Sequence, residues 1–104
     1  MREGVMHDGL FVTFRYEDNF NEQAIRKIAE TARAKFENMP GLRSKAFTVN
    51  SAKREATNFY VWDSEDVAKA FFTDELLERV TGLYGVHPSV EFVQIVTLVE
   101  NDRA

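Results

Sequence analysis

The sequence predicts an α+β fold in which helices cover one face of a four-stranded antiparallel sheet. Three observations lead to this prediction: an alternating aromatic strand near the start, a strand, polar connection and strand within residues 39–62, and an apolar strand near the end. Two stretches with apolar residues at helical spacing lie between these strands. The resulting order is the ferredoxin-like βαββαβ pattern. We expect a single domain over residues 1–104 with short polar tails at 1–8 and 100–104.

The first strand is predicted over residues 10–16, where apolar and polar residues alternate. One face carries Leu10, Val12, Phe14 and Tyr16, and the other carries Phe11, Thr13 and Arg15. Aromatic residues on both faces indicate that both faces are at least partly covered.

The first helix is predicted to begin near Asn19, because Asn19 followed three residues later by Glu22 resembles a capping box. It is expected to run to about Asn38, before Pro40 and Gly41, which stop a helix. Its apolar stripe consists of Ile25, Ile28, Ala29, Ala32 and Phe36.

The central hairpin combines strands at 42–49 and 58–62 with a polar connection at 50–55. After it, Asp63 or Ser64 is expected to cap a helix over 65–72, and Thr73 or Asp74 a second helix up to Tyr84. Two capping signals so close together predict a helix broken near Thr73.

The last strand is predicted over residues 90–99, which are so apolar that we expect both faces of this strand to be buried. Helices cover only one face of the predicted sheet, so the other face needs a partner. A second copy of the same sheet is the simplest cover, and two-fold dimers are the commonest oligomers. The sequence therefore predicts a homodimer through its sheet faces.

Composition narrows the function classes. The net charge of −4 argues against a nucleic-acid partner, and no segment has the apolar length of a membrane span. The chain has no cysteine, which excludes a thiolate nucleophile and fits the cytoplasmic location we expect. His7 and His87 are isolated, and no phosphate-binding loop or nucleophile elbow is present. The sequence therefore gives no signal for a metal site, and it lacks the commonest cofactor-binding and hydrolase motifs.

Four features in their order and spacing resemble a known family. They are LFVTF (10–14), PGLRSKAFT (40–48), FYVW (59–62) followed by DSEDVAKA (63–70), and the apolar closing strand. Over roughly residues 8–100 the chain is similar to the YdhR-type monooxygenases, within the antibiotic-biosynthesis-monooxygenase-like group of dimeric α+β barrel proteins.

The resemblance implies a cofactor-independent monooxygenase that oxidises an aromatic or apolar small molecule with O₂ in a pocket between sheet and helices. Characterised members carry an Asn and a Trp four residues apart, which Asn58 and Trp62 match. Asn58 would bind a phenolate oxygen, Trp62 would donate through its N–H, and Tyr60 would hold the ring or relay a proton. His87 is a candidate general base. The candidate substrate-binding residues are Phe14, Phe36, Phe47, Phe71, Phe72 and Tyr84.

Other interpretations remain open at this point. Haem-degrading members carry a His ten residues beyond the Trp, where this chain has Phe72, which disfavours haem. Trp62 could instead be a core or interface residue. Asn58 could lie on an exposed strand edge, and His87 could lie in a solvated loop. The basic residues near the hairpin, Arg43, Lys45, Lys53 and Arg54, could bind an acidic substrate or nucleic acid. We interpret them as solubility residues paired with Glu55 or Glu91. A non-catalytic ligand-binding or stress-related dimer is the alternative function, and an accessory subunit that assembles through its edge strand is a third.

Overall fold

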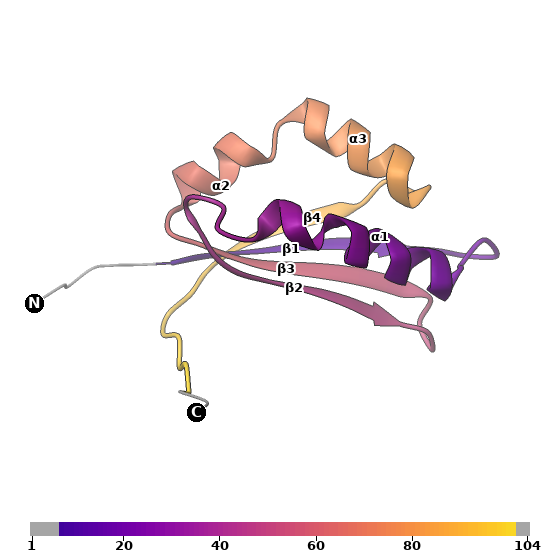
Figure 1. The fold of residues 1–104 in the computed structure, drawn as a ribbon, viewed down its shortest axis with the longest axis horizontal. Helices are drawn as coiled ribbons and strands as arrows, with labels where there is room; N and C mark the ends of the chain where they lie inside the picture. The colour runs from indigo at the N-terminus through magenta and orange to yellow at the C-terminus, as the bar shows by residue number, and fades with distance from the viewer. Residues whose placement is uncertain (1–6, 102–104) are drawn as a thin grey trace, which may run out of the picture.

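The computed structural model describes residues 7–101, which form four strands and three helices (Figure 1). In chain order these are β1 (Asp8–Arg15), α1 (Glu22–Phe36), β2 (Leu42–Asn50), β3 (Glu55–Trp62), α2 (Glu65–Phe71), α3 (Asp74–Tyr84) and β4 (Ser89–Gln94). Most of the predicted N-terminal tail and the last residues of the C-terminal tail lie outside the described residues.

The strands form one sheet in the order β2-β3-β1-β4, and every neighbouring pair is antiparallel. In the register, Phe11 of β1 lies opposite Phe59 of β3 and Glu91 of β4. All three helices lie on the same side of this sheet (Figure 1). The ferredoxin-like α+β prediction is confirmed.

The core lies between the sheet and the helices, and the alternation predicted for the first strand places it. Leu10, Val12 and Phe14 are almost completely buried on the helix-covered face. β3 contributes Ala56, Tyr60 and Trp62 to the same cluster. Because side chains alternate along a strand, every second residue of β1 and β3 faces the helices.

Helix boundaries follow side-chain caps. α1 begins two residues later than Asn19 predicts, because the Asn21 side chain accepts a hydrogen bond from the backbone N–H of Ala24 at 3.0 Å. Glu22, placed in the predicted capping box, instead binds Arg26 and Ser51. The predicted break between the later helices is confirmed: Ser64 caps α2 and Thr73 caps α3.

The last strand is shorter and more exposed than its composition suggests. β4 ends at Gln94, which pairs with Asp8, the first residue of β1. Beyond it, the backbone N–H of Ile95 donates to the carbonyl of His7, and Val96 is 94% exposed. The predicted strand through Val99 is therefore too long, because β4 pairs with β1 and β1 begins at Asp8.

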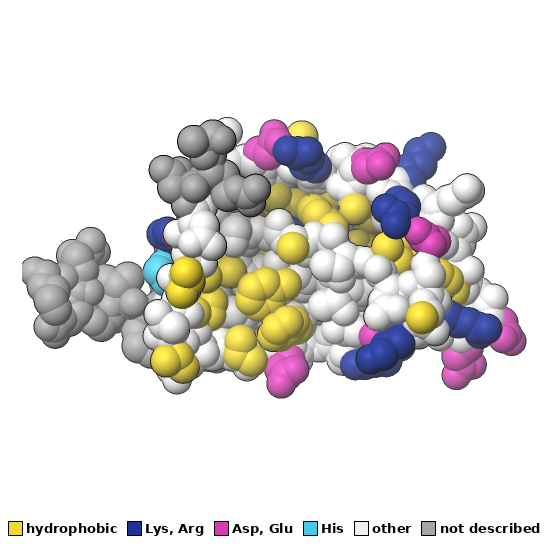
Figure 2. Space-filling view, turned by 90° about the horizontal axis from the view of Figure 1, so that it is seen from below, with side chains coloured by type: hydrophobic (Ala, Val, Ile, Leu, Met, Phe, Trp, Pro, Cys, Tyr) yellow, Lys and Arg dark blue, Asp and Glu magenta, His cyan; other side chains and the backbone are white. Residues whose placement is uncertain are grey.

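The sheet face away from the helices carries an apolar patch at one end (Figure 2). Phe11 and Phe59 pack there with ring centroids 4.6 Å apart, and Phe11 is 36% exposed. A Cβ at Gly9 would lie 2.8 Å from Val93 and close to Ile95, so these side chains close over the glycine. We call Phe11, Phe59, Val93 and Ile95 the sheet patch. None of the three helices is long and apolar enough to cross a membrane.

Candidate functional site

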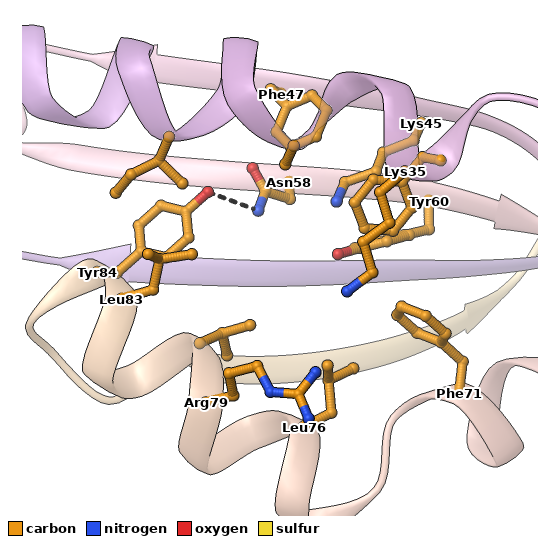
Figure 3. A pocket seen from close by; sticks show the side chains of 14 residues that line it. Lys35, Lys45, Phe47, Asn58, Tyr60, Phe71, Leu76, Arg79, Leu83 and Tyr84 are labelled. Atoms are coloured by element: carbon orange, nitrogen blue, oxygen red, sulfur yellow. Dashed lines mark hydrogen bonds between the residues drawn. The ribbon is translucent and has the colours of Figure 1, made fainter.

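A cavity of about 80 Å³ lies between the sheet and the helices. Its walls come from α1, α2, α3, β2 and β3 (Figure 3). Most of the lining is apolar or aromatic, with a few polar heads directed inward, which is the usual composition of a small-molecule site.

The pairing of β2 with β3 brings together the residues that form the sheet wall of the cavity. Asn58 lies opposite Phe47, and Tyr60 lies opposite Lys45, so four cavity residues come from two neighbouring strands. Because β-strand side chains alternate, these residues share the helix-covered face. Phe36, at the end of α1, meets Phe47 and Tyr60 edge-on at centroid distances of 6.0 and 6.1 Å.

Asn58 is the buried amide of the site, with 5% of its surface exposed. Its Nδ2 donates a hydrogen bond of 3.2 Å to the hydroxyl of Tyr84 (Figure 3). Tyr84 is itself fixed, since its ring stacks on Phe14 at 3.8 Å and its backbone carbonyl accepts from the Tyr16 hydroxyl at 2.8 Å. Asn58 and Tyr84 also line a second cavity of about 140 Å³ toward α1 and β2.

Tyr60 is held by aromatic neighbours. Trp62 stacks on its ring at 5.8 Å and 11°, and Phe72 meets it edge-on at 5.1 Å. Burial raises the pKa of both Tyr60 and Tyr84. Both side chains are therefore protonated phenols at neutral pH, suited to donating a hydrogen bond rather than accepting a proton.

Lys45, which the sequence interpretation placed among the solubility residues, lines the cavity. Its Nζ lies 3.4 Å from the ring centroid of Phe36, 4.1 Å from that of Phe47 and 4.3 Å from that of Tyr60. Burial, with a smaller contribution from Lys35, lowers the pKa of Lys45 to about 7. The signal was present in the sequence, because Lys45 alternates in phase with Phe47 and Val49 along the strand.

The structure brings together part of the predicted set. Six of the predicted residues line the cavity: Asn58, Tyr60, Phe36, Phe47, Phe71 and Tyr84. Trp62, Phe14 and Phe72 do not line it, and each packs against a tyrosine that does. The buried Nε1 of Trp62 has no hydrogen-bond partner within residues 7–101.

His87 is exposed and lies outside the cavity, where its Nδ1 is 3.2 Å from the hydroxyl of Thr81. Sequence reasoning also missed Lys35 and Arg79, which line the cavity from α1 and α3. Among the described residues, no group of three His, Asp or Glu side chains is arranged to hold a metal ion.

The fold and the site together define a class: small ferredoxin-like α+β proteins with an aromatic-lined cavity between sheet and helices. Within that class, the family described as "Putative mono-oxygenase ydhR" matches residues 10–90. The chain belongs to this family, as its sequence features predicted. A search of curated proteins found no match.

Solved structures share the fold at low sequence identity. A Streptomyces coelicolor monooxygenase from the gene ActVA-Orf6, in complex with nanaomycin D, has a TM-score of 0.69 and 19% identity, with 96% of each chain covered. A dimeric ferredoxin-like protein of unknown function from Thermobifida fusca has a TM-score of 0.62 and 14% identity, covering 88% of this chain and 92% of the other. A mutant of SnoaB, a cofactor-independent oxygenase from Streptomyces nogalater, has a TM-score of 0.57 and 13% identity, covering 93% and 97%.

Proposed function

We propose that this protein is a cofactor-independent monooxygenase that oxidises an aromatic or otherwise apolar small molecule with O₂ in the cavity. The observation that carries the proposal is the buried amide of Asn58, which lines an otherwise largely aromatic cavity beside the hydroxyl of Tyr84. Membership of the family and the oxygenases among the structural neighbours support it.

The proposed chemistry requires little from the protein. A phenolic substrate loses a proton, and its electron-rich anion transfers electrons to O₂. One oxygen atom becomes a carbonyl at a former CH₂ carbon, and the other leaves as water. Asn58 binds the substrate oxygen as its negative charge develops. The cavity excludes water from the reacting ring.

Tyr60 and Trp62 have different proposed roles. Tyr60 lines the cavity and donates its phenolic proton in a hydrogen bond to the substrate. Trp62 acts as a positioning residue, because it stacks on Tyr60 outside the cavity lining. Donation by the Trp62 N–H to the substrate, and base catalysis by His87, stay predictions from the sequence alone.

We also propose that the protein is a homodimer joined through the open sheet faces. The sheet patch places partly exposed apolar side chains on the face that the helices leave uncovered (Figure 2). A structural neighbour from Thermobifida fusca is described as dimeric. The cytoplasmic location stays a prediction.

The test is oxygen consumption with an anthrone-type phenol in chelator-treated buffer. We expect oxygen uptake to match product formed, and we expect Asn58→Ala to lower the rate by about a hundredfold or more, in the range of a lost oxyanion donor. Asn19→Ala, on the exposed β1–α1 turn, is the matched control and should leave the rate unchanged. Saturable binding without oxygen uptake would contradict the proposal and favour a ligand-binding dimer.

A further inference from the structure

The cavity carries positive charge without any acidic partner. Lys35, Lys45 and Arg79 line it, and its lining contains no Asp or Glu. This contrasts with the chain as a whole, whose net charge is −4. Among the described residues the ion pairs join other cations, so none of these three is neutralised by a carboxylate.

The ammonium of Lys45 lies at the inner end of this cluster. Three aromatic rings surround its Nζ, at centroid distances of 3.4, 4.1 and 4.3 Å. Ring faces stabilise the charge of an ammonium but accept few of its hydrogen bonds. No hydrogen bond joins this ammonium to another residue of the described chain, so its N–H donors are available to a ligand.

The polar groups that line the cavity with Lys45 come from three other elements. Lys35 extends from α1 and Arg79 from α3, while β3 contributes Tyr60 and α3 contributes Tyr84 (Figure 3). In Figure 3 the amino groups of Lys35 and Lys45 both point into the cavity, near the hydroxyl of Tyr60.

One acidic residue lies near Lys45 on the outer side. Glu37 lines a more open pocket of about 260 Å³, which shares Phe36, Lys45 and Phe47 with the cavity. Its carboxylate is already paired with Arg33 at 3.2 Å. The charges facing the cavity are therefore cationic, and the neighbouring carboxylate is engaged elsewhere.

We propose that this end of the cavity is a subsite for the anionic oxygen of an aromatic ligand, a carboxylate or a phenolate, bound by Lys45 with Lys35 beside it. Phe36, Phe47 and Phe71 receive the apolar ring of the ligand. An anion relieves the repulsion between the two ammonium groups and accepts hydrogen bonds from the free N–H groups of Lys45. The inference deepens the proposed function by naming the substrate class, and it depends on that function only in taking this cavity as the substrate site.

Binding of such an anion is expected to depend on pH. Burial and Lys35 hold the pKa of the free Lys45 near 7, so part of the population is neutral at physiological pH. An anion favours the charged form and raises this pKa, so binding takes up a proton. Affinity should therefore fall as the pH rises through the pKa of the free lysine.

The experiment compares two probes of matched shape, 4-nitrobenzoate and its neutral amide, by calorimetry with the full chain and without turnover. At pH 6 we expect the anion to bind wild type at least tenfold more tightly than the amide. Lys45→Met should remove this preference, since it keeps much of the apolar stem and loses the charge. Lys45→Arg should keep the preference and make it insensitive to pH between 6 and 9. Lys27→Met, an exposed α1 lysine, is the control for net charge and should behave as wild type.

A third probe, 4-nitrophenol, separates phenolate from carboxylate binding, because its ionised form is coloured. If the subsite takes phenolates, bound 4-nitrophenol ionises at a lower pH in wild type than in Lys45→Met. Equal affinity of wild type for 4-nitrobenzoate and its amide, or a preference that survives in Lys45→Met of unchanged unfolding midpoint, would overturn the inference. These binding assays need no oxygen and are independent of the oxygen-uptake assay. If wild type selects the anion but shows no oxygen uptake with the anthrone-type phenol, the monooxygenase proposal is refuted and the subsite stands.

Discussion

The amide of Asn58 donates a hydrogen bond to the hydroxyl of Tyr84 at 3.2 Å, and this contact joins the centre of the sheet to the end of α3. The NH₂ group of Asn58 donates and the hydroxyl oxygen of Tyr84 accepts. The same tyrosine ends α3 and stacks on Phe14 in the core. The polar centre of the site is therefore held by the packing that holds the fold.

The first prediction concerns this hydrogen bond. Tyr84→Phe leaves a buried amide without its partner, so the free energy of unfolding should fall by about 1 to 3 kcal/mol. Asn58→Leu combined with Tyr84→Phe replaces both polar groups, and the double variant should be closer to wild type than additivity of the single variants requires. Urea unfolding of the four proteins measures the coupling. Strictly additive effects would show that the contact contributes nothing.

The second prediction concerns Asp8, which is 6% exposed and has one carboxylate oxygen buried without a partner in the described chain. Desolvation, followed by repulsion from Glu65, raises its pKa in the folded state above the ordinary value of 3.8. Between pH 3.8 and the raised pKa of the folded state, the folded protein binds more protons than the unfolded one. The free energy of unfolding therefore falls as the pH rises through this range. Asp8→Asn should flatten this fall and stabilise the protein at pH 7.

Unfolding curves from pH 3 to pH 7 measure this effect. Asp18→Asn, whose side chain is fully exposed in the β1–α1 turn, controls for the lost charge and should leave the slope unchanged. An equal slope in wild type and Asp8→Asn would show that the buried carboxylate does not govern this range.

The third prediction uses two glycines. Gly41 has a φ of +84°, and a Cβ there would lie 2.5 Å from Cγ1 of Val67 in α2. Gly41→Ala should therefore destabilise the protein by about 1 to 3 kcal/mol. Gly82 lies within α3 with nothing within 4 Å of its Cβ position, so Gly82→Ala should stabilise by about 0.5 to 1 kcal/mol. Opposite shifts of the urea midpoint are expected, and a neutral Gly41→Ala would contradict the close packing of the α1–β2 turn against α2.

The fourth prediction tests the dimer. Phe11 and Phe92 are both 36% exposed, yet Phe11 belongs to the sheet patch whereas Phe92 is paired with Leu10 on the helix-covered face. We expect light scattering to give twice the chain mass of 12.0 kDa for wild type and the single mass for Phe11→Glu. Phe92→Glu, with Lys69 near the ring it replaces, should stay dimeric. A monomeric wild type would refute the dimer.

Local chemistry made much of the fold predictable from the sequence. The alternation along β1, the caps at Ser64 and Thr73, and the aromatic β3 each specify their own element. Two predicted boundaries are wrong, because each depends on residues outside the element itself. The end of β4 depends on where β1 begins, since Gln94 pairs with Asp8. The start of α1 depends on which of two asparagines reaches the free N–H groups, and Asn21 does.

The site was predictable where residues share a strand face, and less so where helices supply the walls. Asn58 and Tyr60 alternate on β3, so their common direction follows from the sequence. Lys35 and Arg79 reach the cavity only because α1 and α3 cross the same part of the sheet, which no local pattern encodes. Trp62 matches the spacing of a site residue, but the stacking on Tyr60 places it outside the cavity lining.

The fate of oxygen-18 gas during turnover of a phenolic substrate in chelator-treated buffer tests the proposed oxygenation directly. We expect mass spectrometry to find one labelled atom in the product carbonyl and the other in water, and we expect Asn58→Ala to slow labelling without changing the label's position. A product oxygen that comes from solvent, or labelling that proceeds equally well without the protein, would contradict the proposed oxygenation.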